Sequence, residues 1–266
     1  MTKKKENEEM KKVLLSIVSV AACFGLMRVT SPFIEDHISN RYVGECAIEM
    51  AFAMYAVIAA AVMKRMGVLK FHFKGLATGA AVGGVLLSLN SILLISFIVS
   101  GDPVTASAME ITMFVLNMLL IGVAEEVLFR GIIQNAVMDY CGYDSVKAVR
   151  KGIILSAIPF GLVHMLNAFN PSIILLSATV QAVVAIFVGA VFCTIYYRSG
   201  KNLWACILIH AINDGIVFVF AGGLGDKTQA GIIGDFTLAN LTPAFVYLAV
   251  CMWIMRRRKI ETALAA

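Results

Sequence analysis

The sequence has few charged residues for its length. Asp, Glu, Lys and Arg make up only 15% of the 266 residues, whereas apolar residues make up 60% and the mean hydropathy is +0.86. Soluble domains carry about 25% charged residues. This deficit excludes an ordinary soluble domain and indicates an integral membrane protein.

Several local patterns are also missing. The six cysteines occur singly, without the spacing of a zinc site or a disulfide framework, so we interpret them as small apolar packing residues. No HExxH pattern, which many zinc peptidases carry on a helix, is present. No internal repeat divides the chain, so one membrane domain is the simplest account.

Long apolar runs are what the sequence does contain. They approach the ~20 residues that a helix needs to cross a bilayer, whereas a membrane β-barrel would show short alternating segments. We therefore predict an all-α, polytopic transmembrane helical bundle of about eight spans. The predicted spans are residues 13–30, 45–63, 77–99, 106–138, 152–168, 172–197, 202–222 and 241–255.

The Lys and Arg residues favour one orientation of these spans. The tail 1–12, the turns 64–75, 139–151 and 198–201, and the C-terminal tail carry five, four, three, two and four of them. The outward segments carry only Arg28, Arg41 and Lys227, and Arg130 lies within a span. Because basic residues concentrate in cytoplasmic loops, we predict a multi-pass protein of the cell membrane, N-in and C-in. The net charge of +5 then reflects orientation and attraction to membrane lipid, not nucleic-acid binding.

We divide the chain into four parts on this basis. They are a basic cytoplasmic tail (1–12), three N-terminal spans (13–105), a core (106–222), and an outer loop with the last span and a basic tail (223–266). Glu45 and Glu49 lie near enough to the outer end of the second span to contact water.

Ionisable residues lie inside the predicted spans of the core. They are Glu125, Glu126 and Arg130 in span 106–138, His164 in span 152–168, and His210 and Asp214 in span 202–222. A charge at membrane depth costs at least ~2.5–3.5 kcal/mol, so such residues point to a functional site. At a rise of 1.5 Å per residue, Glu125, His164 and Asp214 all lie about 19–21 Å from the cytoplasmic ends of their spans. We therefore predict that they share one hydrated cavity.

The spacing of these residues suggests different tasks for the two glutamates. Adjacent residues point about 100° apart on a helix, whereas residues four apart share a face. Arg130 can therefore neutralise Glu126 while Glu125 stays free for proton transfer. A carboxylate beside an imidazole such as His164 can make a nucleophile out of water.

Three motifs in this region resemble those of a known family. Glu125-Glu126-Val-Leu-Phe-Arg130, Phe160-Gly-Leu-Val-His164 and His210-Ala-Ile-Asn-Asp214 occur in this order. They are similar to the motifs EExxxR, FxxxH and HxxxN/D of the CAAX protease and bacteriocin-processing (CPBP, Abi) family, which includes the Ras-converting type of intramembrane endopeptidase. The resemblance covers roughly residues 106–222.

The resemblance implies an intramembrane protease that cleaves a peptide or membrane-tethered protein. Because no HExxH helix is present, we predict that it needs no cofactor. Glu125 would activate water with help from His164, His210 and Asp214 would support the oxyanion, and Glu126 and Arg130 would brace the site. An ionised carboxylate cannot donate a hydrogen bond to an oxyanion. We therefore expect Asp214 to orient His210, whose imidazole does the donating.

Other functions remain open at this point. Zinc bound by Glu125, His164 and His210 would give a metal-dependent version of the same protease. A non-proteolytic membrane scaffold or bacteriocin-immunity protein would retain the fold. Its simplest sign in the sequence would be loss of the motif residues, and the motifs here are intact. A proton-coupled carrier would also place Glu and His in the membrane, but the repeat symmetry of many transporters is not evident here.

Overall fold

The computed structural model describes residues 3–101, 104–225 and 227–264. Helices make up its regular structure, and these three ranges contain no strand. In chain order the elements are α1 (Lys3–His37), α2 (Arg41–Val62), η1 (Met66–Leu69), α3 (Phe73–Val82), α4 (Gly84–Ser100), α5 (Ala108–Glu126), η2 (Val127–Gln134), α6 (Asn135–Cys141), α7 (Val146–Val163), η3 (His164–Phe169), α8 (Leu175–Arg198), α9 (Leu203–Phe220), α10 (Gln229–Gly234), η4 (Leu238–Leu241), α11 (Thr242–Ile254) and α12 (Arg257–Leu264).

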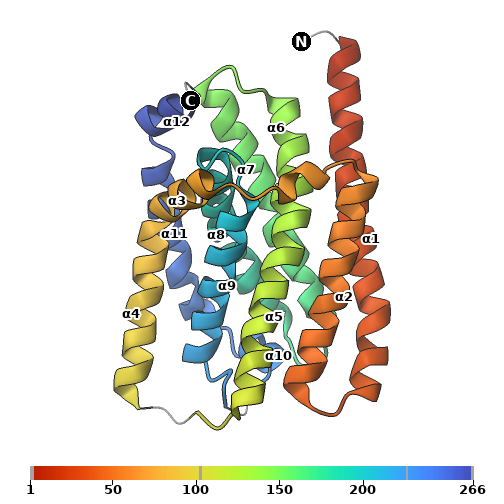
Figure 1. Ribbon diagram of the computed structural model, residues 1–266, viewed down its shortest axis with the longest axis vertical. Helices are drawn as coiled ribbons and strands as arrows, with labels where there is room; N and C mark the ends of the chain where they lie inside the picture. Colours follow the sequence, from red (N-terminus) through yellow and green to blue (C-terminus); the bar gives the residue numbers. More distant parts are fainter. Residues whose placement is uncertain (1–2, 102–103, 226, 265–266) are drawn as a thin grey trace.

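The helices are long enough to form a membrane bundle (Figure 1). In the described part, six helical segments are long and apolar enough to span a membrane, and two bent pairs bring the number to as many as eight. The bent pairs are α3 with α4, at 68°, and η4 and α11 with α12, at 54°. The predicted all-α bundle of about eight spans is confirmed, and the chain is a multi-pass membrane protein.

Both described ends of the chain lie at the same end of the bundle. Figure 1 places the start of α1 and the whole of α12 there, together with the turn before α7. An even number of crossings requires this arrangement. The side of the membrane that this end faces stays a prediction from the distribution of Lys and Arg.

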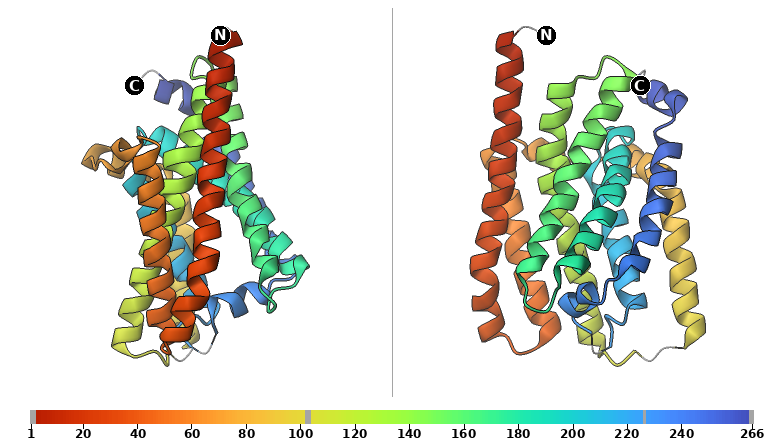
Figure 2. Two further views of the ribbon diagram at one scale, coloured as in Figure 1. Left: turned by 90° about the vertical axis from the view of Figure 1, so that its right-hand side faces the viewer. Right: turned by 180° about the vertical axis from the view of Figure 1, so that it is seen from behind.

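The predicted N-terminal tail is helical. Helix α1 begins at Lys3, so the described part of the tail 1–12 forms its first turns, which project beyond the neighbouring helices (Figure 2). Residues 1 and 2 of this tail, and residues 226, 265 and 266 of the predicted last part, lie outside the described residues.

Small residues allow the third span to pack closely on α8 and α9. A Cβ atom on Gly79 would meet the side chain of Ala205, and one on Gly83 would lie 2.8 Å from Cδ1 of Ile209. Lipid tails are as apolar as helix surfaces, so close packing of this kind is what holds membrane helices together. The span bends at Gly83, between α3 and α4.

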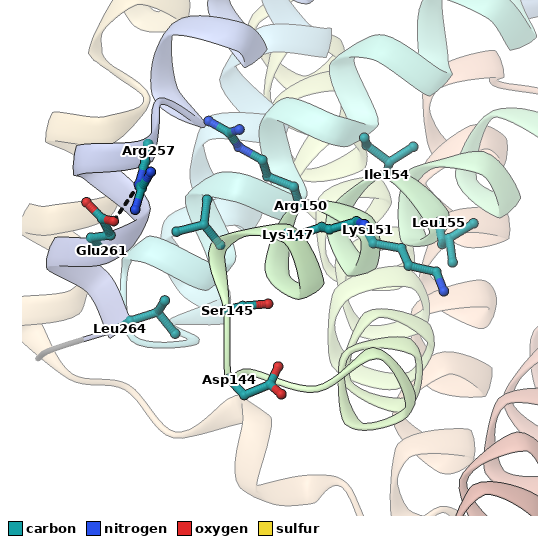
Figure 3. A pocket seen from close by; sticks show the side chains of 11 residues that line it. Asp144, Ser145, Lys147, Arg150, Lys151, Ile154, Leu155, Arg257, Glu261 and Leu264 are labelled. Atoms are coloured by element: carbon teal, nitrogen blue, oxygen red, sulfur yellow. Dashed lines mark hydrogen bonds and ion pairs between the residues drawn. The ribbon is translucent and has the colours of Figure 1, made fainter. Parts of the chain in front are cut away.

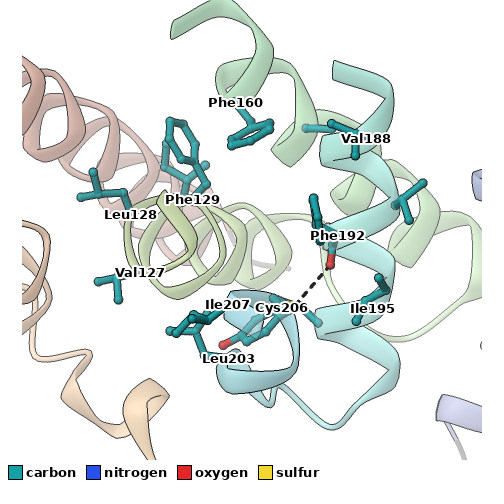
Figure 4. Close-up of a cluster of buried hydrophobic side chains, with 14 of the residues drawn as sticks. Val127, Leu128, Phe129, Phe160, Val188, Phe192, Ile195, Leu203, Cys206 and Ile207 are labelled. Carbon is teal, nitrogen blue, oxygen red and sulfur yellow. Dashed lines mark hydrogen bonds between the residues drawn. The ribbon is translucent and has the colours of Figure 1, made fainter. Parts of the chain in front are cut away.

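The core lies where η2 passes between α7, α8 and α9. Val127 and Leu128 are fully buried, and the Phe129 and Phe160 rings pack nearly perpendicular with their centroids 5.0 Å apart. Figure 4 shows side chains from these elements converging, with Phe192 facing the same region. This packing fixes the positions of the polar groups described below.

The tightest contact in the core is between α7 and α8 at Gly161. A Cβ atom there would meet the side chain of Ile186 and would lie 2.6 Å from the carbonyl oxygen of Ala182. A backbone atom cannot rotate away as a side chain can. The close approach of the two helices therefore requires glycine at this position.

We expect Gly161→Ala to lower the melting temperature of the purified protein in detergent. Overpacking a core costs about 1–3 kcal/mol, because the helices must move apart. Gly25→Ala in α1 is the matched control, since nothing lies within 4 Å of its added Cβ. In a helix this change gains up to ~1 kcal/mol. A melting temperature for Gly161→Ala equal to that of wild type would contradict the close packing.

Candidate active site

A π-helical segment follows directly after Glu126. This segment, η2, has the wider turn that is rare in proteins and common at functional sites. The Asn135 side chain donates to the carbonyl oxygens of Arg130 (3.1 Å) and Gly131 (3.0 Å). Gln134 donates to the carbonyl of Cys193 on α8 at 2.8 Å. The EExxxR motif did not predict the π-helix. The signal that could have indicated it is the pair of amide side chains, Gln134 and Asn135, shortly after the motif in an apolar span.

Glu126 and Arg130 form a completely buried ion pair. Oε1 of Glu126 lies 3.0 Å from Nη1 of Arg130, and both side chains are 0% exposed. Nη2 of Arg130 also donates to the carbonyl of Gly189 at 3.2 Å. Its guanidinium lies 4.3 Å from the ring centroid of Phe160. The cation is thus enclosed by a carboxylate, a carbonyl and an aromatic face, each of which offsets its loss of water.

His210 lies between carboxylates on both edges of its ring. Nδ1 is 2.7 Å from Oε1 of Glu126, and Nε2 is 3.2 Å from Oδ2 of Asp214. Nε2 is also 3.7 Å from Oε2 of Glu125. The ring stacks on Phe192 with centroids 4.9 Å apart. Because a carboxylate accepts, Nδ1 carries a proton, and a second proton is required between Nε2 and Asp214, where two bare acceptors would repel.

Asp214 has its own support, which the sequence motifs did not predict. Asn213 donates to Oδ1 of Asp214 at 3.0 Å, and Asn90 of α4 donates to Asn213 at 3.4 Å. Asn90 is 2% exposed, and an Asn inside an apolar span is the signal that could have indicated it. We expected Asp214 to orient His210. The geometry adds Glu126, which holds the ring from the opposite nitrogen.

His164 presents one ring nitrogen to the site. It follows the last residue of α7, and its Nδ1 lies 2.7 Å from the carbonyl oxygen of Phe160. A carbonyl only accepts, so Nδ1 carries the hydrogen of this bond. In the neutral ring Nε2 therefore keeps its lone pair, which suits it to accept a proton.

Three of the predicted residues line one cavity of about 710 Å³: Glu125, His164 and Asp214. The side chain of Glu125 is 16% exposed, whereas that of its neighbour Glu126 is 0% exposed. Glu126, Arg130 and His210 lie behind the cavity wall. Glu49 of α2 also lines it, so this residue belongs to the surroundings of the site as well as to the outer part of its span.

A larger cavity of about 840 Å³ lies elsewhere, between the start of α7 and α12 (Figure 3). Lys147, Arg150, Lys151 and Arg257 line it together with one Glu, Glu261, which pairs with Arg257 at 2.7 Å. None of the predicted site residues takes part. The smaller cavity is therefore the one with the chemistry of an active site.

The residues predicted as zinc ligands do not form a metal site as they stand. Across the described ranges, no group of three or more His, Cys, Asp or Glu side chains is arranged to hold a metal ion. A zinc-bound imidazole must offer a bare nitrogen. Both ring nitrogens of His210 face carboxylates, and Nδ1 of His164 faces a carbonyl.

The comparisons with known proteins agree with the three motifs. Residues 107–216 match the family model described as type II CAAX prenyl endopeptidase Rce1-like. This segment is similar to the Rce1-like family. Searches of curated proteins and of solved structures each gave no significant match. The Rce1-like segment runs from the start of α5 into α9 and contains all six predicted site residues. The family indicates a CAAX-type intramembrane endopeptidase with a peptide or protein substrate.

We expect Arg130→Ala to destabilise the protein strongly. The change strands the buried carboxylate of Glu126, which costs about 3–5 kcal/mol. The matched control is Arg65→Ala, which breaks a pair with Asp139 (3.1 Å) whose side chains are 28% and 32% exposed. Such a pair contributes about 0–1 kcal/mol. Melting temperatures in one detergent test this, and equal losses for the two variants would argue against the buried pair.

Proposed function

We propose that this protein is an intramembrane endopeptidase that hydrolyses a peptide bond in a membrane-associated peptide or protein. The observation that carries the proposal is the shared cavity of Glu125, His164 and Asp214, with His210 held behind it by Glu126. The match of residues 107–216 to the Rce1-like family supports the reaction class. The assignment of roles below rests on the chemistry of these groups.

Glu125 is the group best placed to activate water. It faces the cavity, and Nε2 of His210 lies 3.7 Å from its Oε2, beyond hydrogen-bond distance, whereas Glu126 is occupied by Arg130. Glu125 takes one proton from water, and the oxygen bonds to the substrate carbonyl carbon while an electron pair moves to the carbonyl oxygen. His164 accepts a hydrogen bond from the same water through Nε2 and so fixes its position.

His210 stabilises the negative oxygen that forms in this step. Its Nε2–H lies on the cavity side of the ring, next to Asp214, and the developing oxyanion competes with Asp214 for that hydrogen. Glu126 keeps the hydrogen on Nδ1 and prevents the ring from turning. Collapse of the intermediate breaks the carbon–nitrogen bond, and Glu125 returns its proton to the leaving nitrogen. The new carboxylic acid then ionises into the cavity water.

Two other functions compete with this one. A membrane scaffold or immunity protein has no need of a carboxylate and an imidazole facing one cavity, or of a braced histidine behind it. A zinc-dependent protease would use Glu125, His164 and His210, and would require His210 to release Asp214 from Nε2. We therefore favour a glutamate-dependent reaction without metal.

We predict that Glu125→Gln and His164→Ala lower turnover by about 10²–10⁴-fold, because the first removes the proton-transfer group and the second removes the imidazole that positions the water. The measurement compares membrane peptidomes of cells that express wild type or a variant, and products that depend on Glu125 also identify the substrate. His37→Ala, an exposed histidine at the end of α1, is the matched control and should retain full activity.

Each variant must also be inserted and folded for this comparison. If a variant has the wild-type amount, melting temperature and product yield, the substituted residue takes no part in the reaction. Peptidomes that do not change with any variant, in cells that contain folded protein, would instead favour the scaffold.

Metal content separates the two protease mechanisms. We expect the purified active protein to contain far less than one zinc per chain and to keep its activity after strong chelation. Zinc ligands must be deprotonated, so a zinc enzyme would lose activity with chelator and regain it with added zinc. One zinc per active molecule, with activity reversible in this way, would replace the metal-free mechanism and leave the protease assignment in place.

A further inference from the structure

The cavity of the candidate site opens toward one end of the bundle. Helices α1, α7 and α9 all run in one direction, and their cavity residues lie late in each helix. Glu35 is two residues before the end of α1, His164 follows the last residue of α7, and Asp214 is in the second half of α9. Pro171, in the connection from η3 to α8, also lines the cavity. The opening therefore lies where these helices end.

The opposite end of the cavity is closed. Glu126, Arg130 and His210 are at most 3% exposed, and the Phe160 ring packs against Arg130. Val127 and Leu128, next along the chain, are fully buried. By contrast, Glu35 and Pro171 at the opening are exposed. The cavity therefore gives a substrate access to Glu125 from the end at which α1, α7 and α9 finish.

Basic residues are concentrated at the closed end. Apart from Arg28, Arg41, Arg130 and Lys227, the Lys and Arg residues of the chain lie in five segments: the first part of α1, residues 64–74 up to the start of α3, the start of α7, residues 198–201 between α8 and α9, and residues 256–259 at the start of α12. Figure 1 shows the start of α1, α12 and the turn before α7 at the same end. Of the Lys and Arg residues that the structure describes, Arg28 alone lines the cavity.

These two asymmetries together indicate which membrane face the substrate comes from. Basic residues mark the cytoplasmic side of a membrane protein. We propose that the cavity opens on the extracytoplasmic face, so that the substrate is a peptide segment presented from outside the cytoplasm. This inference rests on the proposed function, and it excludes a cytoplasmic protein tail as substrate.

The walls of the opening fit such a segment. Apolar side chains of α1 and η3 face it, including Met27, Leu166 and Phe169. Polar amides lie beside them: Asn167 donates to Gln181 at 2.7 Å, and Asn170 lines the cavity near the rim. An extended peptide needs partners for its backbone groups as well as apolar contact. A peptide segment anchored at the outer leaflet would contact both the apolar side chains and the polar amides.

Labelling of single added cysteines from each membrane face tests the proposal. Full-length Pro171→Cys and Glu35→Cys place a thiol at the opening, and Lys147→Cys is the matched variant at the closed end. Right-side-out and inside-out vesicles are treated with a membrane-impermeant maleimide. Wild type gives the background, which is expected to be low because five of its six free cysteines are buried.

We expect both rim variants to be labelled at least about tenfold above wild type in right-side-out vesicles, since an exposed thiol reacts far faster than a buried one. Lys147→Cys should be labelled only in inside-out vesicles. The reverse pattern would overturn the proposal. Gln181→Cys, inside the cavity, should also be labelled from the outer face, and labelling from the inner face alone would overturn it too.

The labelling does not depend on catalytic turnover, so its result tests the orientation of the cavity separately from the proposed function. A protein labelled as expected but without peptidase activity would lose the protease assignment and keep the orientation of its cavity. An active protease whose rim cysteines react only in inside-out vesicles would keep its activity and take its substrate from the cytoplasm.

Discussion

The site depends on the buried ion pair of Glu126 and Arg130. A charge without water is costly in a membrane protein, so each of these groups must be satisfied by protein atoms. Arg130 has the carboxylate of Glu126, the Gly189 carbonyl of α8 and the Phe160 ring of α7. Glu126 in turn bonds His210 of α9. One pair thereby ties four segments of the bundle together at one level.

This pair also makes the two neighbouring glutamates chemically different. Glu126 is engaged on the closed side of the site, and Glu125 points into the cavity with His164 and Asp214. The π-helical segment that follows keeps Arg130 and the next residues buried against α8. Gln134 donates to the Cys193 carbonyl of α8, and Asn135 donates to the Arg130 carbonyl of the π-helical segment itself. In the proposed reaction, a base that exchanges protons with water and a brace that does not are thus placed side by side.

The direction of the cavity follows from where the helices end. Helix α7 stops at Val163, so the 3₁₀ segment η3, which begins at His164, and the connection to α8 form the rim instead of another turn of α-helix. The closed side is sealed by buried residues such as Val127 and Leu128, both 0% exposed. The opening and the basic residues therefore lie at opposite ends of the molecule.

The sequence alone determined the membrane class, the helical bundle and the family of the segment 107–216, because apolar length and motif spacing are local properties of the chain. It also predicted that Glu125, His164 and Asp214 would share a cavity, since a helix has a fixed rise per residue. Only the tertiary structure placed Glu126 on Nδ1 of His210, brought Asn90 to Asn213, and put Glu49 on the cavity wall. These contacts join residues from separate helices. Spacing along one helix cannot fix them, because they depend on how each helix is rotated against its neighbours.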